Sequence, residues 1–161
     1  MTGQEELLTL LHPQVTDAPA LLRTMAGRAR DAGLVGEGFA DAVVAREEQF
    51  PTGLPTPVPA AIPHTDAVHV RRPGRVVALL RDPVDFVEMG STDRYVPVRL
   101  VVMLLVDDPQ AQVEVLGATI AALQDPGLAA RLDGVRGPDD LAAALRGATG
   151  SVRSVAVGGG W

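Results

Sequence analysis

The stretches REEQFPTGL at residues 46–54 and AIPHTD at residues 61–66 lie in the least regular part of the chain. Five prolines fall between residues 49 and 66, at positions 51, 55, 57, 59 and 63. Because proline fixes φ and removes a backbone donor, this segment is predicted to be a stiff loop rather than a central strand or a helix. Long loops inside compact domains are usually either functional or disordered. The apolar residues embedded in this one favour an ordered, functional loop.

Two helices are predicted before the loop. Asp17 is a good N-cap, Pro19 suits an early helical position, and Gly33 is a plausible stop. The apolar face of this first helix comprises Leu21, Leu22, Met25, Ala26 and Ala29. A second helix is predicted at about residues 39–48, whereas the apolar run at residues 7–11 could be a strand or a helical turn.

Strands and helices alternate after the loop. Residues 76–80 predict a strand, residues 86–89 a short edge element, and the apolar run 98–106 a strand buried on both faces. Asp108 is then predicted to cap a helix, and short helices are expected from Asp125 to about residue 132 and from Gly137 to about residue 146. The apolar face of the capped helix is expected to comprise Val113, Leu116, Ile120 and Leu123. This interleaving indicates a mixed α/β layer fold.

Composition narrows the class of protein. The 161 residues suffice for about one domain, and 47% hydrophobic content argues against a disordered chain. A net charge of −6 argues against an electrostatic grip on nucleic acid, and the lack of cysteine excludes a thiolate nucleophile or a zinc–thiolate site. The longest apolar run is far shorter than the roughly 20 residues of a membrane-spanning helix. The acidic N-terminus is unlike a signal peptide, so we expect a soluble, cytoplasmic protein with no membrane insertion.

The three histidines differ in their surroundings. His12 and His69 are predicted to lie at the surface, and the spacing of His64 and His69 is not that of a metal-ligand pair, so no metal site is expected. His64 follows Pro63 and precedes Thr65 and Asp66, which can turn the chain. These neighbours hold His64 in a defined direction, either as a functional group or as a buried, hydrogen-bonded histidine.

The quoted stretches resemble the phosphoacceptor signature of fructose/mannitol-type enzyme IIA components of the bacterial sugar phosphotransferase system. The pattern R-E-…-T-G-…-A-I-P-H is present with its spacing apart from a slightly variable loop, here the proline-rich residues 55–60, and FPTGL favours the galactitol-type subgroup. The resemblance implies a single enzyme IIA-like domain over residues 1–146. It also implies an α/β sandwich with a mixed central sheet flanked by helices and the active histidine at a sheet edge. Residues 147–161 are expected to be a flexible tail or a short added strand.

The resemblance also implies roles for individual residues, and neither a cofactor nor a metal. His64 would accept a phosphoryl group from the phosphocarrier histidine protein and pass it to a cysteine of a cognate enzyme IIB. Arg46 would support the phosphoryl oxygens, unless it only terminates a helix. Glu47 would orient Arg46 or simply be solvated, and Thr52 would donate to phosphate or cap a turn. Gly53 would permit a backbone shape that a side chain would block.

Some questions stay open at this level. Many relatives carry a second histidine where alignment puts Gln112. This residue either replaces that histidine by donating an amide N–H to a phosphoryl oxygen or is a surface residue. The apolar residues Leu54, Val58, Ala60 and Ile62 are either a docking patch for the partners or part of the core. A regulatory phosphorelay module of the nitrogen-related type and a non-catalytic binding module are the alternative functions, and no oligomeric state is predicted.

Overall fold

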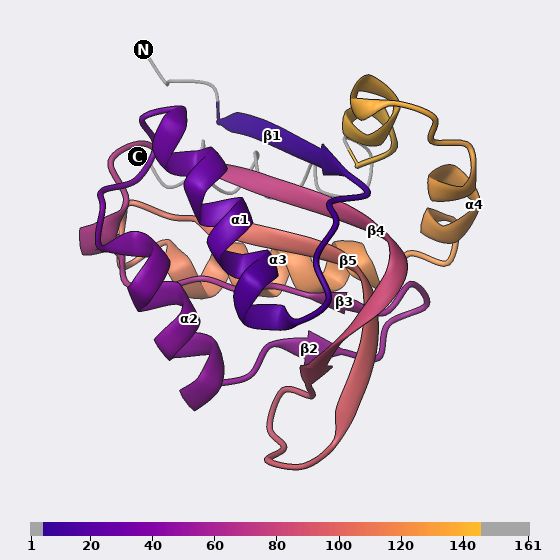
Figure 1. Ribbon diagram of the computed structural model, residues 1–161, viewed down its shortest axis with the longest axis horizontal. Helices are drawn as coiled ribbons and strands as arrows, with labels where there is room; N and C mark the ends of the chain where they lie inside the picture. Colours follow the sequence, from indigo (N-terminus) through magenta and orange to yellow (C-terminus); the bar gives the residue numbers. More distant parts are fainter. Residues whose placement is uncertain (1–4, 146–161) are drawn as a thin grey trace.

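A mixed five-stranded sheet with helices on both faces forms the molecule, for which a computed structural model describes residues 5–145 (Figure 1). The strands are β1 (Glu6–Leu11), β2 (Gly53–Leu54), β3 (Ala60–Ala61), β4 (Gly74–Val87) and β5 (Tyr95–Leu105). The helices are α1 (Ala18–Asp31), α2 (Phe39–Gln49), the 3-10 turn η1 (Ala67–His69), α3 (Gln112–Leu123) and α4 (Leu128–Asp133), and residues 138–145 are also helical. This architecture confirms the predicted α/β sandwich.

The strand order is β1-β4-β5-β3-β2. β1 runs parallel to β4, β4 antiparallel to β5, β5 parallel to β3, and β3 antiparallel to β2. The pairing of Ala60 with Leu100 and of Ala61 with Val101 places the end of the proline-rich loop directly beside the long apolar strand. Among the described residues, the chain beyond Ala61 has no strand partner on the β2 side, because β2 pairs only with Ala60 and Ala61, and it stays bonded to β5 through the Pro63 carbonyl. His64 therefore follows a segment at the edge of the sheet, which is the position that the resemblance implied.

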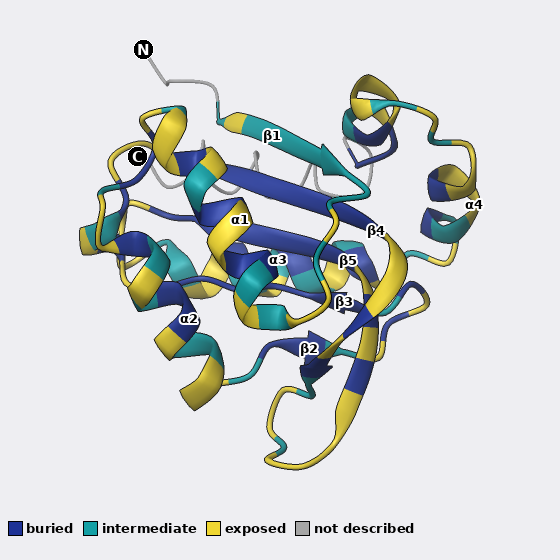
Figure 2. Cartoon of the chain, in the orientation of Figure 1, coloured by how far each residue is buried: buried dark blue, intermediate teal, exposed yellow. Residues whose placement is uncertain are grey.

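Side-chain alternation along β4 and β5 divides the core into two layers. On β5, Val101 and Met103 pack with the α1 and α2 side, whereas Val102 and Leu104 pack with the α3 and α4 side. The stretch Leu100–Leu105 is buried throughout, as Figure 2 shows, so the prediction of a strand covered on both faces is confirmed.

The first helix begins and ends as predicted. The Asp17 side chain accepts a hydrogen bond from the backbone N–H of Ala20 at 2.8 Å, and Pro19 occupies the first turn. Gly33 follows the helix with φ +76°, a conformation that favours glycine. The predicted apolar face is the buried one.

Three local predictions were wrong. The first is that residues 76–80 and 86–89 are separate elements, whereas residues 74–87 form the single strand β4. β4 has a register shift between Leu79 and Val84, and Pro83 is tolerated there because the pairing with β1 ends at Leu79. The second is that the proline-rich segment is a loop without strands, whereas it contains β2 and β3, each two residues long.

The third wrong prediction concerns the start of α3, which has Ala111 rather than Asp108 at its N-cap. It buries Val115, Thr119 and Leu123 and leaves Val113 77% exposed, so the predicted apolar face is rotated. The tail predicted at residues 147–161 lies outside the described residues.

Candidate phosphoacceptor site

His64 lies just beyond the carboxyl end of β3. The preceding Pro63 is fixed to β5, because its carbonyl accepts a hydrogen bond from the Leu104 N–H at 3.0 Å. The histidine is 9% exposed, which makes it more buried than an outward-facing surface histidine. Its ring is held by the backbone: Nδ1 lies 2.9 Å from the carbonyl oxygen of Ile62.

This contact assigns the tautomer of the ring. A carbonyl oxygen can only accept, so Nδ1 carries the proton and Nε2 keeps its lone pair in the neutral ring. Burial lowers the pKa of His64 below its usual value, and the nearby charge of Arg46 lowers it further. The hydrogen bond to Ile62 and the charge of Asp66 oppose this shift. The ring is therefore mainly neutral at pH 7, with Nε2 as the nucleophilic atom.

Arg46 lies in the last turn of α2 and is turned toward the His64 loop. Its Nη1 is 3.4 Å from Oδ1 of Asp66, and its guanidinium lies 4.8 Å from the centre of the Phe50 ring. Its Nε is buried and has no hydrogen-bond partner among residues 5–145. A guanidinium with an unused donor beside a nucleophilic imidazole suits a phosphoryl group.

Glu47 and Thr52 form a hydrogen-bonded unit behind the histidine. The two carboxylate oxygens of Glu47 accept from the Thr52 N–H and hydroxyl, each at 2.7 Å. The Thr52 hydroxyl oxygen accepts in turn from the Ile62 N–H at 3.2 Å. Glu47 is thus connected to His64 by hydrogen bonds through Thr52 and the Ile62 peptide, and it does not bond to Arg46 within the described residues. Thr52 holds this unit together, because its hydroxyl donates to Glu47 and accepts from Ile62.

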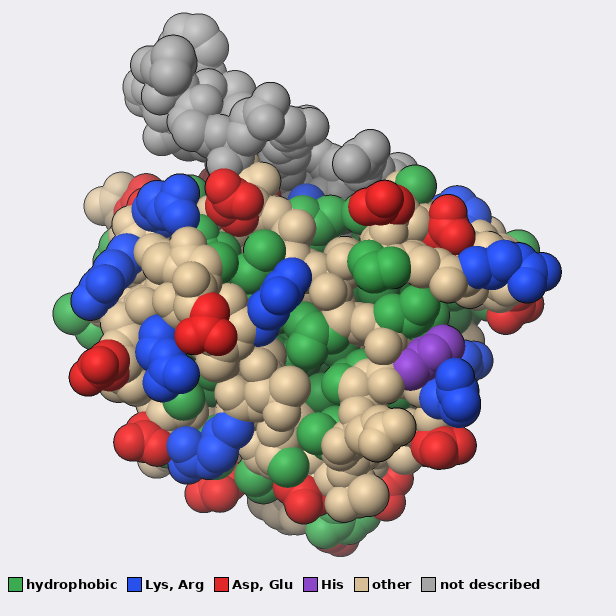
Figure 3. Space-filling model, turned by 45° about the horizontal axis from the view of Figure 1, so that its top comes forward, with side chains coloured by type: hydrophobic (Ala, Val, Ile, Leu, Met, Phe, Trp, Pro, Cys, Tyr) green, Lys and Arg blue, Asp and Glu red, His purple; other side chains and the backbone are tan. Residues whose placement is uncertain are grey.

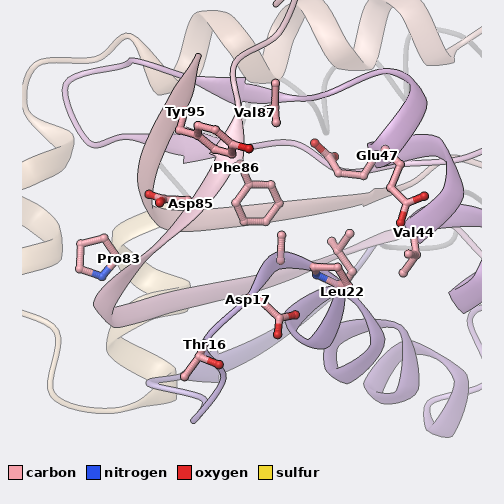
Figure 4. Close-up of a pocket in the computed structure, with 13 residues that line it drawn as sticks. Thr16, Asp17, Leu22, Val44, Glu47, Pro83, Asp85, Phe86, Val87 and Tyr95 are labelled. Atoms are coloured by element: carbon pink, nitrogen blue, oxygen red, sulfur yellow. The ribbon is translucent and has the colours of Figure 1, made fainter. Parts of the chain in front are cut away.

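Burial raises the pKa of Glu47 to about 7, although both hydrogen bonds from Thr52 favour the charged form. Glu47 also lines a pocket of about 400 Å³, which lies between α1, α2 and the part of β4 and β5 where residues 84–87 pair with residues 95–98. Figure 4 shows Glu47, Asp17 and Asp85 around the ring of Phe86 in this pocket. Glu47 therefore joins the pocket on one side to the His64 loop on the other.

Gly53 is required by the packing of the motif. A Cβ added at this position would lie 2.6 Å from the carbonyl oxygen of Val87, so the backbones of β2 and β4 approach too closely for a side chain. The Gly53 carbonyl accepts from the Met89 N–H at 2.8 Å. Gly53 thereby fixes the turn that presents Thr52 to Glu47.

Gln112 is the first residue of α3 and lies beside the His64 loop. Its Nε2 donates to the carbonyl of Thr65 at 2.8 Å, so one amide proton is already engaged. Gln112 is half-buried, and this hydrogen bond holds it against the loop. The structure brings His64, Arg46, Glu47, Thr52 and Gln112 into one neighbourhood.

Sequence reasoning missed three contributors. Asp66 and Phe50 contact Arg46, and the Ile62 carbonyl sets the histidine tautomer. Phe50 lies four residues after Arg46 at a helix end and Asp66 two after His64, so spacing was a usable signal for both side chains. A backbone carbonyl leaves no such signal in the sequence.

The four apolar loop residues are core rather than a docking patch. Val58, Ala60 and Ile62 are at most 6% exposed and pack in the α3 side of the core, with Leu54 partly buried against them. The exposed apolar side chains near the site are instead Phe50 (55%), Val68 (84%) and Val113 (77%). Each lies on a segment that carries a site residue.

The described part of the chain lacks both a metal-binding cluster and a membrane-spanning helix. Residues 5–145 contain no group of three or more His, Cys, Asp or Glu side chains placed to hold a metal ion. No helix within the same range has the length and apolar character needed to cross a membrane. On the face shown in Figure 3, acidic and basic side chains are interspersed among apolar ones.

Comparison with solved structures shows the fold. A structure of mannitol enzyme IIA in complex with phosphorylated enzyme IIB, from Escherichia coli, superposes with a TM-score of 0.69 at 21% identity, covering 91% of this chain and 98% of that one. The nitrogen regulatory protein IIA-Ntr of Neisseria meningitidis gives a TM-score of 0.65 at 24% identity, covering 86% and 91%.

Sequence comparison shows the family. The galactitol-specific EIIA component of Escherichia coli K12 is 37% identical over 97 residues, which are 58% of this chain and 63% of that protein. The match thus spans less than two thirds of the curated relative. Residues 4–147 match the family model described as phosphoenolpyruvate-dependent sugar phosphotransferase system, EIIA 2. Since that match covers most of the sequence, the chain belongs to this EIIA family.

Proposed function

We propose that this protein is a phosphocarrier that accepts a phosphoryl group on Nε2 of His64 and passes it on. The donor is the phosphocarrier histidine protein and the acceptor a cysteine of a cognate enzyme IIB. The observation that carries the proposal is the Nδ1–Ile62 hydrogen bond, which leaves Nε2 unprotonated beside the guanidinium of Arg46. The proposal implies a cytoplasmic location together with these partners.

The transfer itself needs little covalent machinery. The lone pair of Nε2 forms a bond to phosphorus while the N–P bond of the donor phosphohistidine breaks, and its electron pair stays on the donor nitrogen. Throughout, the His64 ring keeps its proton on Nδ1, which donates it to the hydrogen bond with the Ile62 carbonyl. Onward transfer forms an S–P bond on the cysteine thiolate and returns the electron pair to Nε2. No nucleotide site or metal is required for either step.

Arg46 is the proposed electrostatic partner of the phosphoryl oxygens, because its buried Nε is an unused donor. Glu47 and Thr52 are proposed as positioning residues that act through Ile62. Gln112 is proposed to hold the Thr65 carbonyl, with its second amide proton open to the phosphoryl group. The first N–H groups of α3 add positive potential at the same place.

The partner surface is proposed to surround His64. Phe50 follows the helix of Arg46, Val68 lies in η1 after His64, and Val113 follows Gln112, and all three are exposed apolar side chains. Exposed apolar groups around a reactive centre suit transient docking with two successive proteins. The relative from Escherichia coli is a galactitol-specific EIIA component, and we propose that this chain serves a sugar or hexitol uptake system of that type.

The test is phosphorylation by phosphoenolpyruvate, enzyme I and the phosphocarrier histidine protein, followed by mass spectrometry. We expect one acid-labile phosphoryl group on the wild type and on His69→Ala, a matched control, and none on His64→Ala. Full labelling of His64→Ala would overturn the proposal. A wild type that takes up no phosphoryl group would indicate a non-catalytic binding module. Labelling without transfer to any enzyme IIB would favour the regulatory alternative.

A further inference from the structure

The guanidinium of Arg46 has only a partial set of contacts. Its Nη1 lies 3.4 Å from Oδ1 of Asp66, a long contact for an ion pair, and the two side chains are 36% and 71% exposed. Its Nε is buried without a hydrogen-bond partner among residues 5–145, and its face rests on Phe50. The guanidinium is thus held by Asp66 at Nη1 only, and its enclosed Nε makes no hydrogen bond within the described residues.

Within residues 5–145, the Asp66 carboxylate makes no hydrogen bond or ion pair other than its contact with Arg46. It stands at the N-cap of η1, yet its side chain makes no capping hydrogen bond there, and only its backbone carbonyl serves the turn by accepting from the His69 N–H at 3.2 Å. The carboxylate is directed instead to Arg46. Its negative charge and the positive charge of Arg46 shift the pKa of His64 in opposite directions, so both act on the same ring.

We propose that Asp66 is the resting partner of Arg46, and that the guanidinium exchanges this carboxylate for the phosphoryl group when His64 is phosphorylated. This inference rests on the proposed phosphocarrier function. It assigns Asp66 the role of a positioning residue that acts through Arg46.

The exchange follows from the charges and the donor geometry. A phosphoryl group carries more negative charge than a carboxylate and can take two parallel donors from the guanidinium. Asp66 gives up only one long contact. Because the carboxylate still competes for Arg46, the phosphoryl group is held less tightly than it would be by an unpaired arginine. Asp66 therefore keeps the phosphohistidine transferable to the next protein.

The competition predicts the effect of Asp66→Asn. Removing the carboxylate charge frees Arg46 for the phosphoryl group, so the equilibrium between the donor protein and His64 should shift about two- to fivefold toward phosphorylated His64, the range of a solvent-exposed ion pair. Hydrolysis of the phosphohistidine should slow by a similar factor. The free energy of unfolding should stay near the wild-type value, because no capping bond is lost.

A matched control is available on the helix that carries Arg46. Asp41 lies 2.8 Å from Arg23 in an exposed ion pair, so Asp41→Asn makes the same change in charge outside the His64 site. We expect this variant to keep the wild-type equilibrium and hydrolysis rate. An equal shift of the equilibrium in both variants would show that it comes from the change in net charge alone, and would overturn the inference.

A double-mutant cycle separates competition from direct repulsion. Asp66→Asn is compared in the wild-type and Arg46→Gln backgrounds. Phosphoramidate, a small N–P donor, loads the histidine without a partner protein, and the hydrolysis rate is followed by ³¹P NMR. The inference requires the two- to fivefold effect to vanish when Arg46 is absent. An effect that persists without Arg46, or no effect in the wild-type background, would overturn it. A wild type that the phosphocarrier histidine protein does not label would instead overturn the proposed function.

Discussion

The Nδ1 atom of His64 is bonded to the carbonyl of Ile62, two residues earlier in the chain, at 2.9 Å. The N–H of the same Ile62 is bonded to the Thr52 hydroxyl at 3.2 Å, and that hydroxyl donates to Glu47 at 2.7 Å. Ile62 therefore holds the His64 ring through its carbonyl and is itself held by Thr52 through its N–H. The reactive atom Nε2 is defined by this backbone, which is anchored to α2 through Glu47.

Thr52→Val tests this anchor. Valine keeps the shape of threonine but removes the hydroxyl, leaving the Ile62 N–H and one oxygen of Glu47 without partners in a site where Thr52 is 3% exposed. We expect a loss of about 1–3 kcal/mol in the free energy of unfolding by urea denaturation. The fraction of His64 protonated on Nδ1, measured by ¹⁵N NMR, should also fall. Thr52→Ser keeps the hydroxyl and is the control; equal behaviour of the two variants would contradict the anchor.

Glu47 predicts a pH dependence of stability. Its pKa is raised from 4.5 to about 7, so the folded protein keeps a proton that the unfolded chain has lost between these values. The resulting stabilisation is complete below pH 4.5 and is lost as the pH rises through 7. Between pH 5 and 8 we expect the wild type to lose on the order of 2 kcal/mol relative to Glu47→Gln. Glu48→Gln should follow the wild-type curve, and parallel curves for all three proteins would refute the assignment.

Gly53→Ala tests the close approach of β2 to β4. The new Cβ would lie 2.6 Å from the Val87 carbonyl oxygen, so the backbone must shift, at a cost of about 1–3 kcal/mol in the free energy of unfolding. Gly117 is the matched control, because it lies inside α3 with nothing within 4 Å of an added Cβ. Gly117→Ala should stabilise by about 0.5–1 kcal/mol. Denaturation curves that rank the two variants in the opposite order would be inconsistent with this packing.

Gln112 is tested by two substitutions. Gln112→Ala removes the 2.8 Å hydrogen bond to the Thr65 carbonyl, and we expect phosphoryl transfer from the carrier protein to slow about threefold. Gln112→Glu cannot donate and adds negative charge, so its loss should be larger. Gln124→Ala, at the other end of α3, is the control. Unchanged stopped-flow rates for Gln112→Ala would remove Gln112 from the site.

The sequence predicted the elements with strong local signals. The Asp17 cap and apolar periodicity located α1, and the unbroken run 98–106 located β5. It did not predict β2 and β3, because two-residue strands have no periodicity and exist only through their pairing with β5 and each other. The full length of β4 was missed because Pro83 is acceptable only where one neighbouring strand has ended.

For the site, the motif predicted which side chains lie together but not which hydrogen bonds they make. Glu47 was assigned to Arg46 or to solvent, whereas it binds Thr52. That contact depends on the turn at Gly53, which is set by the distant carbonyl of Val87. The burial of Val58 and Ile62 likewise depends on β5 and α3 and cannot be read from the loop alone.

The most direct test of the central claim is the atom that carries the phosphoryl group. Protein labelled with ¹⁵N-histidine is phosphorylated with phosphoenolpyruvate, enzyme I and the phosphocarrier histidine protein, and ³¹P–¹⁵N coupling is measured by NMR. The account predicts phosphorus on Nε2 of His64, with Nδ1 still protonated by virtue of its bond to Ile62. Phosphorus on Nδ1 of His64, or on any other residue, would contradict it.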